Sequence, residues 1–469
     1  MTPVWLSRLQ FALTASFHYI YPPISMGLGL MLVVIGIIYL RTKDPKWRRM
    51  SFFWVKVYGL VFAIGVATGV VQEFEFGTNW AEYSRFVGNI FGSLLAAEGV
   101  FAFFLEGGFL GLMLFGGNRL GPRMWLAATA IVAFGAHFSA LWIVMANSWM
   151  QTPAGYEILP TAFGVQAFMT SFSEIVFTPS FIPRILHVWT SAWMVGAALM
   201  LSVSAFYVLR NRHLDVAKAN FKTAMPFFVV FSILQLFLFG AAQAEEVAVN
   251  QPVKLAAMEG VWEDTSCAPM TIVGIVDVQN QTTYGIKVPC LLSFLAFKDI
   301  NATVQGLNSF PRDTWPPIKL TFHSYHVMIN LGMIFVAIGL LGTLLAFWKQ
   351  KIWGIRPALW LFVLTIFLAE TATIAGWWTA EFGRQPWIVW ELLRTVDAVS
   401  PNLVAWQIAA SVGMFVVLYA ILFILFIYLL NEKIQKGPES LEEMEQTPVT
   451  SLPDTFRDVF RGRGGRARA

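Results

Sequence analysis

The sequence predicts an all-α membrane protein with nine transmembrane helices, its N-terminus outside and its C-terminus in the cytoplasm. Hydrophobic residues make up 57% and charged residues 13% of the 469 residues, whereas about a quarter of a soluble domain is charged. Nine segments are apolar over the roughly 20 residues that a spanning helix needs. Lys and Arg gather in alternate connections between these segments, as the positive-inside rule requires. The net charge of +4 is therefore a sign of topology, and no nucleic-acid partner is expected.

The nine segments follow one another along most of the chain. They are residues 11–40, 52–71, 91–115, 123–147, 185–209, 223–243, 318–346, 357–378 and 404–430. The first is too long for the apolar part of a signal peptide, and no small-residue cleavage site follows it, so it is expected to stay as a helix. The basic connections follow the odd-numbered helices, at 41–49, 119–123, 210–222, 349–356 and 433–468. These connections are therefore expected in the cytoplasm.

The chain divides into four parts. Residues 1–243 carry helices 1–6, residues 244–317 form a long extracytoplasmic loop, residues 318–430 carry helices 7–9, and residues 431–469 form a disordered basic tail. The loop holds both cysteines, Cys267 and Cys290. Because the outer face is oxidising, a disulfide between them is expected, with two unpaired thiols as the alternative. Two cysteines exclude an all-cysteine iron–sulfur cluster.

Two carboxylates interrupt the third apolar segment. Glu98 and Glu106 lie eight residues apart, hence about 12 Å along a helix. The residues around them include no basic partner. Ionisable residues inside a membrane are rare and are functional by default. The pair therefore indicates proton conduction or ion binding, and a purely structural role is the weaker alternative.

Possible metal ligands gather near the outer ends of the predicted helices. His18 and His187 lie on helices 1 and 5, and His326 and Met328 lie on helix 7. His and Met are axial ligands of haem iron, so together they indicate an outer-leaflet haem site. Taken singly, each His could be an interfacial hydrogen-bonding residue and the Met a packing residue. For His137, in the middle of helix 4, a proton path and a local hydrogen bond both stay open.

The end of helix 8 combines charge with aromatic residues. Glu381 and Arg384 are three residues apart, so they share one side of the last turn if the helix persists that far. Gly383 and Pro386 are expected to end the helix. A carboxylate beside an arginine at the membrane edge indicates a cofactor or a charge network. An interfacial anchor made by Trp and Arg is the alternative.

Several of these segments resemble subunit I of the cytochrome bd quinol oxidases. The resemblance begins with Ser-Arg-Leu-Gln-Phe-Ala-Leu-Thr-Ala at 7–15, followed by His18, and extends to about residue 390. It includes Gly-Val-Ala-Thr-Gly (65–69), Phe-Gly-Thr-Asn-Trp (76–80), Ser-Ala-Leu-Trp-Ile (139–143), Ala-Asn-Ser-Trp-Met-Gln (146–151), Lys-Leu-Ala-Ala-Met-Glu (254–259) and Gly-Arg-Gln-Pro-Trp (383–387). The helix with Glu98 and Glu106 belongs to it as well.

The resemblance implies three haems: a low-spin haem b, a high-spin haem b, and haem d or a further haem b in its place. By motif, His187 and Met328 would be the axial ligands of the low-spin haem. His18 and Glu381 would be ligands at the two high-spin haems, with Glu98 as a competing ligand. Which of them serves which iron stays open.

The other roles that the resemblance implies concern protons, quinol and charge. These are a proton path at Glu98 and Glu106, a quinol site at Lys254 and Glu259, a propionate partner at Arg384, and an aromatic residue between the haems at Trp377. The chain departs from many family members at His326, where they carry Arg, and at Gly107, where some place a hydroxyl. The loop lacks the insertion of long-loop members, so a short-loop type is expected.

The implied function is that of a terminal quinol oxidase in the bacterial cytoplasmic (inner) membrane. It would oxidise ubiquinol or menaquinol at the outer face and reduce O2 to water with cytoplasmic protons, building a proton motive force without pumping. The implied partners are subunit II and, in some assemblies, a small single-helix subunit, and the basic tail is expected to meet anionic membrane lipid. An ion-coupled transporter and a dihaem quinone-linked electron carrier are the alternatives.

Overall fold

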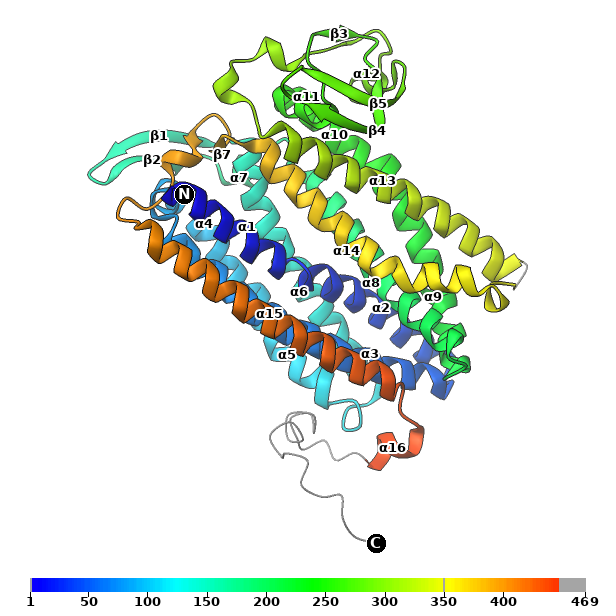
Figure 1. The fold of residues 1–469 in the computed structure, drawn as a ribbon. Coiled ribbons are helices and arrows are strands. Elements are labelled where there is room, and N and C mark those ends of the chain that lie inside the picture. Colours follow the sequence, from blue (N-terminus) through cyan, green and yellow to red (C-terminus); the bar gives the residue numbers. More distant parts are fainter. Residues whose placement is uncertain (1, 349–350, 447–469) are drawn as a thin grey trace.

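The computed structural model describes residues 2–348 and 351–446, and Figure 1 shows them as a long helical bundle with a small domain at one end. Within these residues, nine helices are long and apolar enough to cross a membrane. They are α1–α2 (Pro3–His18, Tyr21–Thr42), α3 (Pro45–Thr78), α4–η1–α5 (Ala81–Ala97, Glu98–Phe103, Phe104–Phe115), α6 (Pro122–Gln151), α8 (Phe181–Leu209), α9–η2–α10 (Leu214–Leu234, Gln235–Phe239, Gly240–Asn250), α13–η5 (Ile318–Thr343, Leu344–Trp348), α14 (Arg356–Arg384) and α15 (Ala405–Lys436).

All nine predicted helices are present, and most extend beyond their apolar segments. The first begins at Pro3 instead of residue 11, because Thr2 accepts a hydrogen bond from the Trp5 amide and Pro3 suits the first helical position. Asp44 and Pro45 begin α3 in the same way. Hydropathy detects only the apolar middle of a helix, so polar first and last turns escape it.

The basic connections lie together at one end of the bundle, here called the basic end. Arg49 pairs with Asp215 at 3.2 Å, and Arg48 donates to Asn118 at 3.0 Å. These contacts join the connections after the first, third and fifth spans. Which end of the bundle faces the cytoplasm stays a prediction from the positive-inside rule.

The centre of the bundle is α8, which packs against α2, α9 and α14. Glycines allow α2 and α8 to approach each other closely. A Cβ atom on Gly27 would lie 2.1 Å from the Ala192 carbonyl oxygen, and one on Gly196 would lie 2.2 Å from the Gly27 carbonyl carbon. Small residues at such crossings let two backbones pack together inside a membrane.

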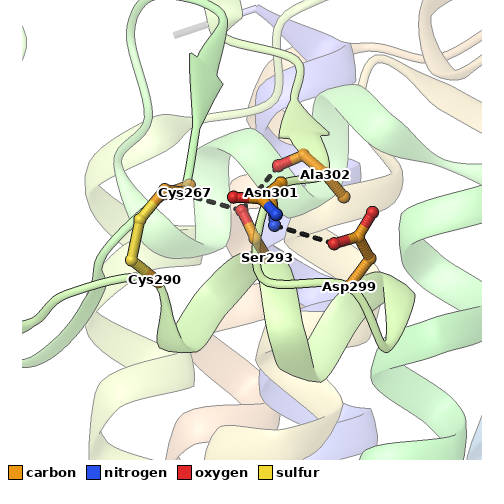
Figure 2. The surroundings of a disulfide bond; sticks show 7 residues. Cys267, Cys290, Ser293, Asp299, Asn301 and Ala302 are labelled. Atoms are coloured by element: carbon orange, nitrogen blue, oxygen red, sulfur yellow. Dashed lines mark hydrogen bonds between the residues drawn. A yellow bond between two sulfur atoms is a disulfide. The ribbon is translucent and has the colours of Figure 1, made fainter.

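The opposite end, here called the hairpin end, carries the folded connections. The predicted loop after helix 6 is compact, and α10 reaches Asn250 before it begins. Its elements are α11 (Pro252–Glu259), β3 (Thr265–Ser266), β4 (Met270–Asp277), β5 (Thr282–Val288), α12 (Leu291–Phe297), β6 (Thr303–Val304), η3 (Leu307–Ser309) and η4 (Arg312–Thr314). Strands β4 and β5 form an antiparallel hairpin, and a disulfide joins Cys267 to Cys290 beside α12 (Figure 2).

Smaller elements complete the hairpin end. They are β1 (Tyr156–Thr161), β2 (Gly164–Met169), α7 (Phe172–Val176), β7 (Trp387–Val389), β8 (Leu393–Arg394) and η7 (Thr395–Asp397). At the basic end lie η6 (Ile352–Gly354) and α16 (Leu441–Gln446). The sequence predicts disorder from residue 431, but α15 continues to Lys436 and α16 follows. Glu439 between them pairs with Lys56 at 2.6 Å, and residues 447–469 lie outside the described part of the chain.

Candidate functional site

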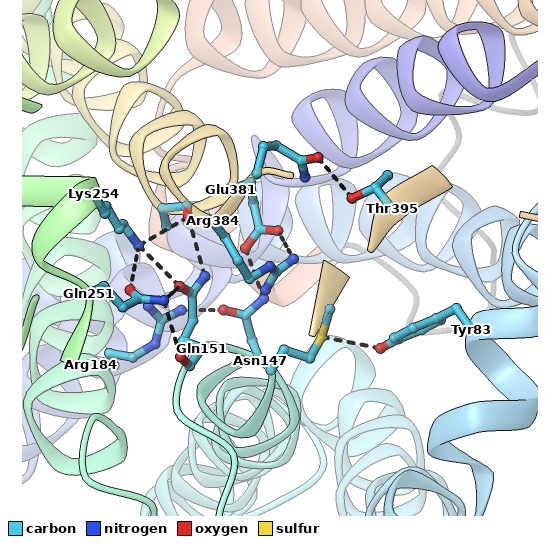
Figure 3. A network of polar contacts seen from close by, with 12 residues as sticks. Tyr83, Asn147, Gln151, Arg184, Gln251, Lys254, Glu381, Arg384 and Thr395 are labelled. Atoms are coloured by element: carbon cyan, nitrogen blue, oxygen red, sulfur yellow. Dashed lines mark hydrogen bonds and ion pairs between the residues drawn. The ribbon is translucent and has the colours of Figure 1, made fainter. Parts of the chain in front are cut away.

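A buried polar network occupies the hairpin end of the bundle, where α6, α8, α11 and α14 meet (Figure 3). Helix α14 extends beyond its predicted span to Arg384, and Arg384 forms an ion pair with Glu381 one turn earlier. Asn147 of α6 donates to the Glu381 carboxylate at 3.1 Å and accepts a hydrogen bond from Arg184 of α8. We call this cluster the hairpin-end network; its members are Asn147, Gln151, Arg184, Gln251, Lys254, Glu381 and Arg384.

Lys254 enters the network from α11. Its ammonium donates to the side-chain carbonyls of Gln151 and Gln251 at 3.0 and 3.1 Å, and to the Ala380 carbonyl at 3.2 Å. A Cβ atom on Gly383 would lie 2.7 Å from the Lys254 side chain, so glycine is needed there. Burial, with the positive charges of Arg184 and Arg384, holds the pKa of Lys254 well below its usual range.

The network has more positive than negative charge. Arg184, Lys254 and Arg384 are at most 5% exposed, and Glu381 is their one anionic member. Two nitrogens of Arg384, Nε and Nη1, are buried without a hydrogen-bond partner. Buried charges are normally paired. The network therefore fits additional anionic oxygens, such as the propionate groups of haem.

His18 is the last residue of α1, and its ring is oriented by α3. Its Nδ1 lies 3.0 Å from the Thr68 hydroxyl, which itself donates to the Ile64 carbonyl at 2.9 Å. With the Thr68 proton on that carbonyl, His18 Nδ1 is the donor, and its Nε2 is then unprotonated and able to bind a metal. A Cβ atom on Gly69 would lie 3.0 Å from the His18 ring, so this ring also needs a neighbouring glycine.

His187 and Met328 lie on α8 and α13, which both pack against α14 and η2. The His187 Nδ1 atom is buried without a hydrogen-bond partner. A Cβ atom on Gly376 would lie 3.0 Å from the Met328 sulfur, so glycine on α14 makes room for the thioether. An orphaned imidazole nitrogen and an accommodated thioether fit the two axial ligands of a haem.

Trp377 lies on α14, directly after Gly376. Its ring meets the Tyr19 ring edge-on, with centroids 5.4 Å apart, and the Arg184 guanidinium lies 5.9 Å from its centroid. Trp377 therefore connects the network to the residue that follows His18.

His326 does not face the network. Its Nδ1 lies 2.8 Å from the Phe322 carbonyl oxygen and its Nε2 lies 2.9 Å from the Thr271 carbonyl oxygen. The ring also stacks on Phe322, with centroids 4.0 Å apart. His326 thus attaches strand β4 to α13.

Glu259 and Lys254 occupy different environments, although both belong to α11. Five residues along a helix turn a side chain by about 140°. Glu259 lines a cavity of about 280 Å³ beneath the β4–β5 hairpin, with Trp262, Thr283 and Lys287 among its other lining residues. Burial raises the pKa of Glu259 to about 7, although the Tyr325 hydroxyl and the Thr271 amide oppose this rise.

The two membrane carboxylates each have one hydroxyl partner, and we call them the carboxylate pair. Glu98 begins the π-helical turn η1 and accepts a hydrogen bond from Ser139 at 2.6 Å. Glu106 on α5 accepts one from Tyr58 at 3.2 Å. Wide helical turns of this kind often accompany functional sites. Among the described salt bridges, none involves either carboxylate.

Several partners in these sites were not predicted from the sequence. Arg184 lies one turn before His187, and Asn147 and Gln151 lie one turn apart on α6; these spacings were the available signals. Glu370 on α14 was also overlooked, and its two carboxylate oxygens are buried without a partner. The role of His137 is now defined locally: Trp193 donates to its Nε2 at 2.6 Å, and its Nδ1 donates to the Ala133 carbonyl at 2.7 Å.

The possible iron ligands are dispersed. Within residues 2–348 and 351–446, no three His, Cys, Asp or Glu side chains gather to hold a bare metal ion. A haem needs only one or two protein ligands for each iron, because the macrocycle supplies the others. Single ligands on separate helices, with a cationic cluster beside them, match that requirement.

Comparisons with known proteins find relatives that match this chain over most of its length. The family model described as cytochrome bd terminal oxidase subunit I matches residues 6–438. The chain is 36% identical to cytochrome bd ubiquinol oxidase subunit 1 of Bacillus subtilis, covering 98% of this chain and 99% of the relative. It is 34% identical to cytochrome bd-II ubiquinol oxidase subunit 1 of Escherichia coli, covering 94% and 98%. A solved structure of bd oxidase from Geobacillus thermodenitrificans matches with a TM-score of 0.87 at 28% identity, covering 93% of this chain and 99% of that one.

Proposed function

The chain belongs to the subunit I family of cytochrome bd terminal oxidases, and from this premise we propose that it carries the quinol-oxidising and oxygen-reducing sites of its complex. The coarse function follows from the family: a membrane-bound terminal quinol oxidase subunit with haem cofactors and a second subunit as partner. The residue roles, the haem types and the coupling to proton movement are the proposal. The observation that carries it is the cationic hairpin-end network beside single His and Met ligands.

His187 and Met328 would hold a low-spin haem b, and His18 and Glu381 would serve the two high-spin haems, with Glu98 as the competing ligand. When bound, the haems supply the electron carriers and the iron at which O2 is reduced. Arg384 would pair with propionate oxygens through its unpartnered nitrogens, and the buried guanidinium of Arg184 would add positive charge nearby. The oxygen-reducing haem would be haem d, or haem b in its place.

Quinol would be oxidised at the hairpin end. The cavity beneath β4 and β5, at about 280 Å³, is close to the lower end of the about 300–1,000 Å³ typical of small-molecule sites. Glu259 lines it and has a pKa of about 7, so its carboxylate can accept a proton from the quinol hydroxyl. Lys254, held by two amides, would fix α11 against the network and so position Glu259. Ubiquinol and menaquinol both suit this chemistry.

Protons for water formation would pass Glu106 and then Glu98. Each carboxylate accepts a hydrogen bond from one hydroxyl and lacks an ion-pair partner among the described salt bridges. Such a group can gain and lose a proton without breaking a network. Protons taken from the cytoplasm and released outside would separate charge without a pump, storing about 2.3 kcal/mol per charge per 100 mV.

A reduced-minus-oxidised absorption spectrum of the purified complex tests this proposal. Low-spin haem b, high-spin haem b and a red chlorin band would support the oxidase with haem d, and two high-spin b signals would support the form with haem b alone. Only low-spin haem b would favour the dihaem electron carrier. A spectrum without haem bands would favour the ion-coupled transporter and overturn the proposal.

A further inference from the structure

We propose that protons reach Glu106 through a water molecule held between α2, α3 and α6 and then through the hydroxyl of Tyr58. The inference rests on the proposed function, because it names the route that supplies the carboxylate pair. It adds three residues to that function: Tyr58 as the proton relay, and Ser51 and Thr129 as the side chains that hold the water.

Tyr58 is the hydroxyl positioned to protonate Glu106. Its Oη atom donates to Glu106 Oε1 at 3.2 Å, and the two residues are 0% and 8% exposed. The next residues on α5 are Gly107 and Gly108, which have no side chain that could relay a proton. On the α6 side, a Cβ atom on Gly135 would lie 3.2 Å from both the Cβ and the backbone nitrogen of Glu106, so α6 packs closely against α5 at this residue.

A small cavity lies on the basic-end side of Tyr58. Its volume is about 10 Å³, which is close to the roughly 10–15 Å³ that one water molecule needs. Tyr39, Ser51 and Thr129 contribute the hydroxyl groups of its lining. Ser51 Oγ is buried without a hydrogen-bond partner. A buried hydroxyl without a partner beside a water-sized space is the usual sign of an ordered water.

Three helices place this cavity one turn from the Tyr58 ring. The ring packs against Gly29 of α2, where a Cβ atom would lie 3.5 Å from Tyr58 Cε2 and 3.2 Å from Ala133 Cβ of α6. The cavity residues Leu32, Val55 and Thr129 lie three or four positions toward the basic end from Gly29, Tyr58 and Ala133. The cavity therefore lies about one helical turn, roughly 5.4 Å, toward the basic end from Gly29, Tyr58 and Ala133.

The other side of the cavity leads toward the basic end. Tyr39, which lines it, lies three residues before the end of α2 at Thr42. The Lys43 ammonium lies 6.0 Å from the centre of the Tyr39 ring. Ser51, Val55 and Tyr58 share one face of α3, because four and seven residues bring side chains to the same side of a helix. The route thus follows one face of α3 from the basic end to Glu106.

In the proposed proton transfer, Tyr58 gives one proton to Glu106 and takes another from the water. The Tyr58 O–H bond breaks as its proton passes to the ionised Glu106 carboxylate, and a new O–H bond forms as the same oxygen takes a proton from the water. The water is then reprotonated from the basic end. No electron moves, and the tyrosine is neutral before and after the step.

The substitution Tyr58→Phe, made in the complete oxidase complex and reconstituted in liposomes, tests whether the Tyr58 hydroxyl relays protons. After an oxygen pulse to the reduced complex, we expect proton uptake at least tenfold slower than in the native complex, with unchanged haem spectra, because a positioned proton-transfer group contributes about 10²–10⁴-fold. The matched control is Tyr207→Phe, another buried tyrosine near the basic end, whose hydroxyl donates to the Ile434 carbonyl at 2.8 Å. Uptake at the native rate in Tyr58→Phe would overturn the route.

A second measurement does not depend on turnover. A high-resolution density map of the complex should show one ordered water within hydrogen-bonding distance of Ser51 Oγ, and Ser51→Val should remove it and slow proton uptake. A dry cavity would overturn the inference. An active complex with haems but without this water leaves the proposed function standing, whereas a complex without haems refutes the proposed function itself.

Discussion

The hairpin-end network and the carboxylate pair hold buried charge in opposite ways. In the network, Lys254 donates three hydrogen bonds and Glu381 is held by both Arg384 and Asn147. In the pair, each carboxylate has a single hydroxyl partner, Ser139 for Glu98 and Tyr58 for Glu106. Multiple partners fix a charge in place, which suits the binding of a cofactor. A single neutral partner leaves the protonation state free to change, which suits proton transfer.

The largest effect is expected where a cofactor is held. Met328→Leu conserves volume but removes the proposed sulfur ligand, so we expect the low-spin haem signal to be lost or converted to high-spin while the fold is retained. Absorption spectra and helical circular dichroism measure both outcomes. The control is Met225→Leu, a fully buried methionine on α9. A native low-spin spectrum in Met328→Leu would rule out this ligand.

The second-largest effect is expected for substitutions in the carboxylate pair. Glu106→Gln keeps shape but cannot accept a proton, so we expect oxygen consumption to fall by about 100-fold or more with haem content unchanged. The matched control is Glu75→Gln, because Glu75 on α3 is also a buried carboxylate. Native turnover in Glu106→Gln would show that protons take another path. The single hydroxyl partner of each carboxylate in the pair would then be no sign of a role in proton transfer.

A smaller, pH-dependent effect is expected at Glu259. Because burial raises its pKa to about 7, the Glu259 carboxylate, which we propose accepts the quinol proton, is mostly protonated below that pH and mostly ionised above it. The KM for quinol should therefore fall as pH rises through about 7. Glu259→Gln should raise KM several-fold and remove this pH dependence, with the haem spectrum intact. Glu263→Gln, on the exposed side of the same segment, is the control. A persisting pH dependence in Glu259→Gln would assign it to another group.

The smallest effect on turnover is expected at the disulfide. Cys267 and Cys290 are 23 residues apart, and closing a loop of that size stabilises a folded domain by about 3 kcal/mol. Cys267→Ser should lower the thermal stability of the hairpin-end domain while haem spectra and turnover at moderate temperature stay native. Reduction of the native protein should reproduce the shift. Loss of haem in Cys267→Ser would contradict this expectation, because it would show that haem binding depends on the disulfide.

Several features of the candidate site were accessible from residue types and motifs. The Glu381–Arg384 turn was predictable because helical spacing alone brings residues i and i+3 to one side. The partners of these residues were not, because Asn147, Arg184 and Lys254 come from three other elements. The motif also placed Lys254 and Glu259 in one quinol site, whereas the rotation of α11 directs them to different neighbours.

By itself, the sequence predicted the nine membrane-spanning helices that the described part of the chain contains, and it indicated which membrane residues are chemically unusual. Hydropathy, loop charge and isolated carboxylates are local properties, so they can be identified without a fold. Tertiary structure alone decided that three cations and one carboxylate meet at the hairpin end, that His326 attaches a strand, and that Tyr58 meets Glu106. Those contacts join residues far apart in the chain, and their geometry depends on how the helices cross and rotate.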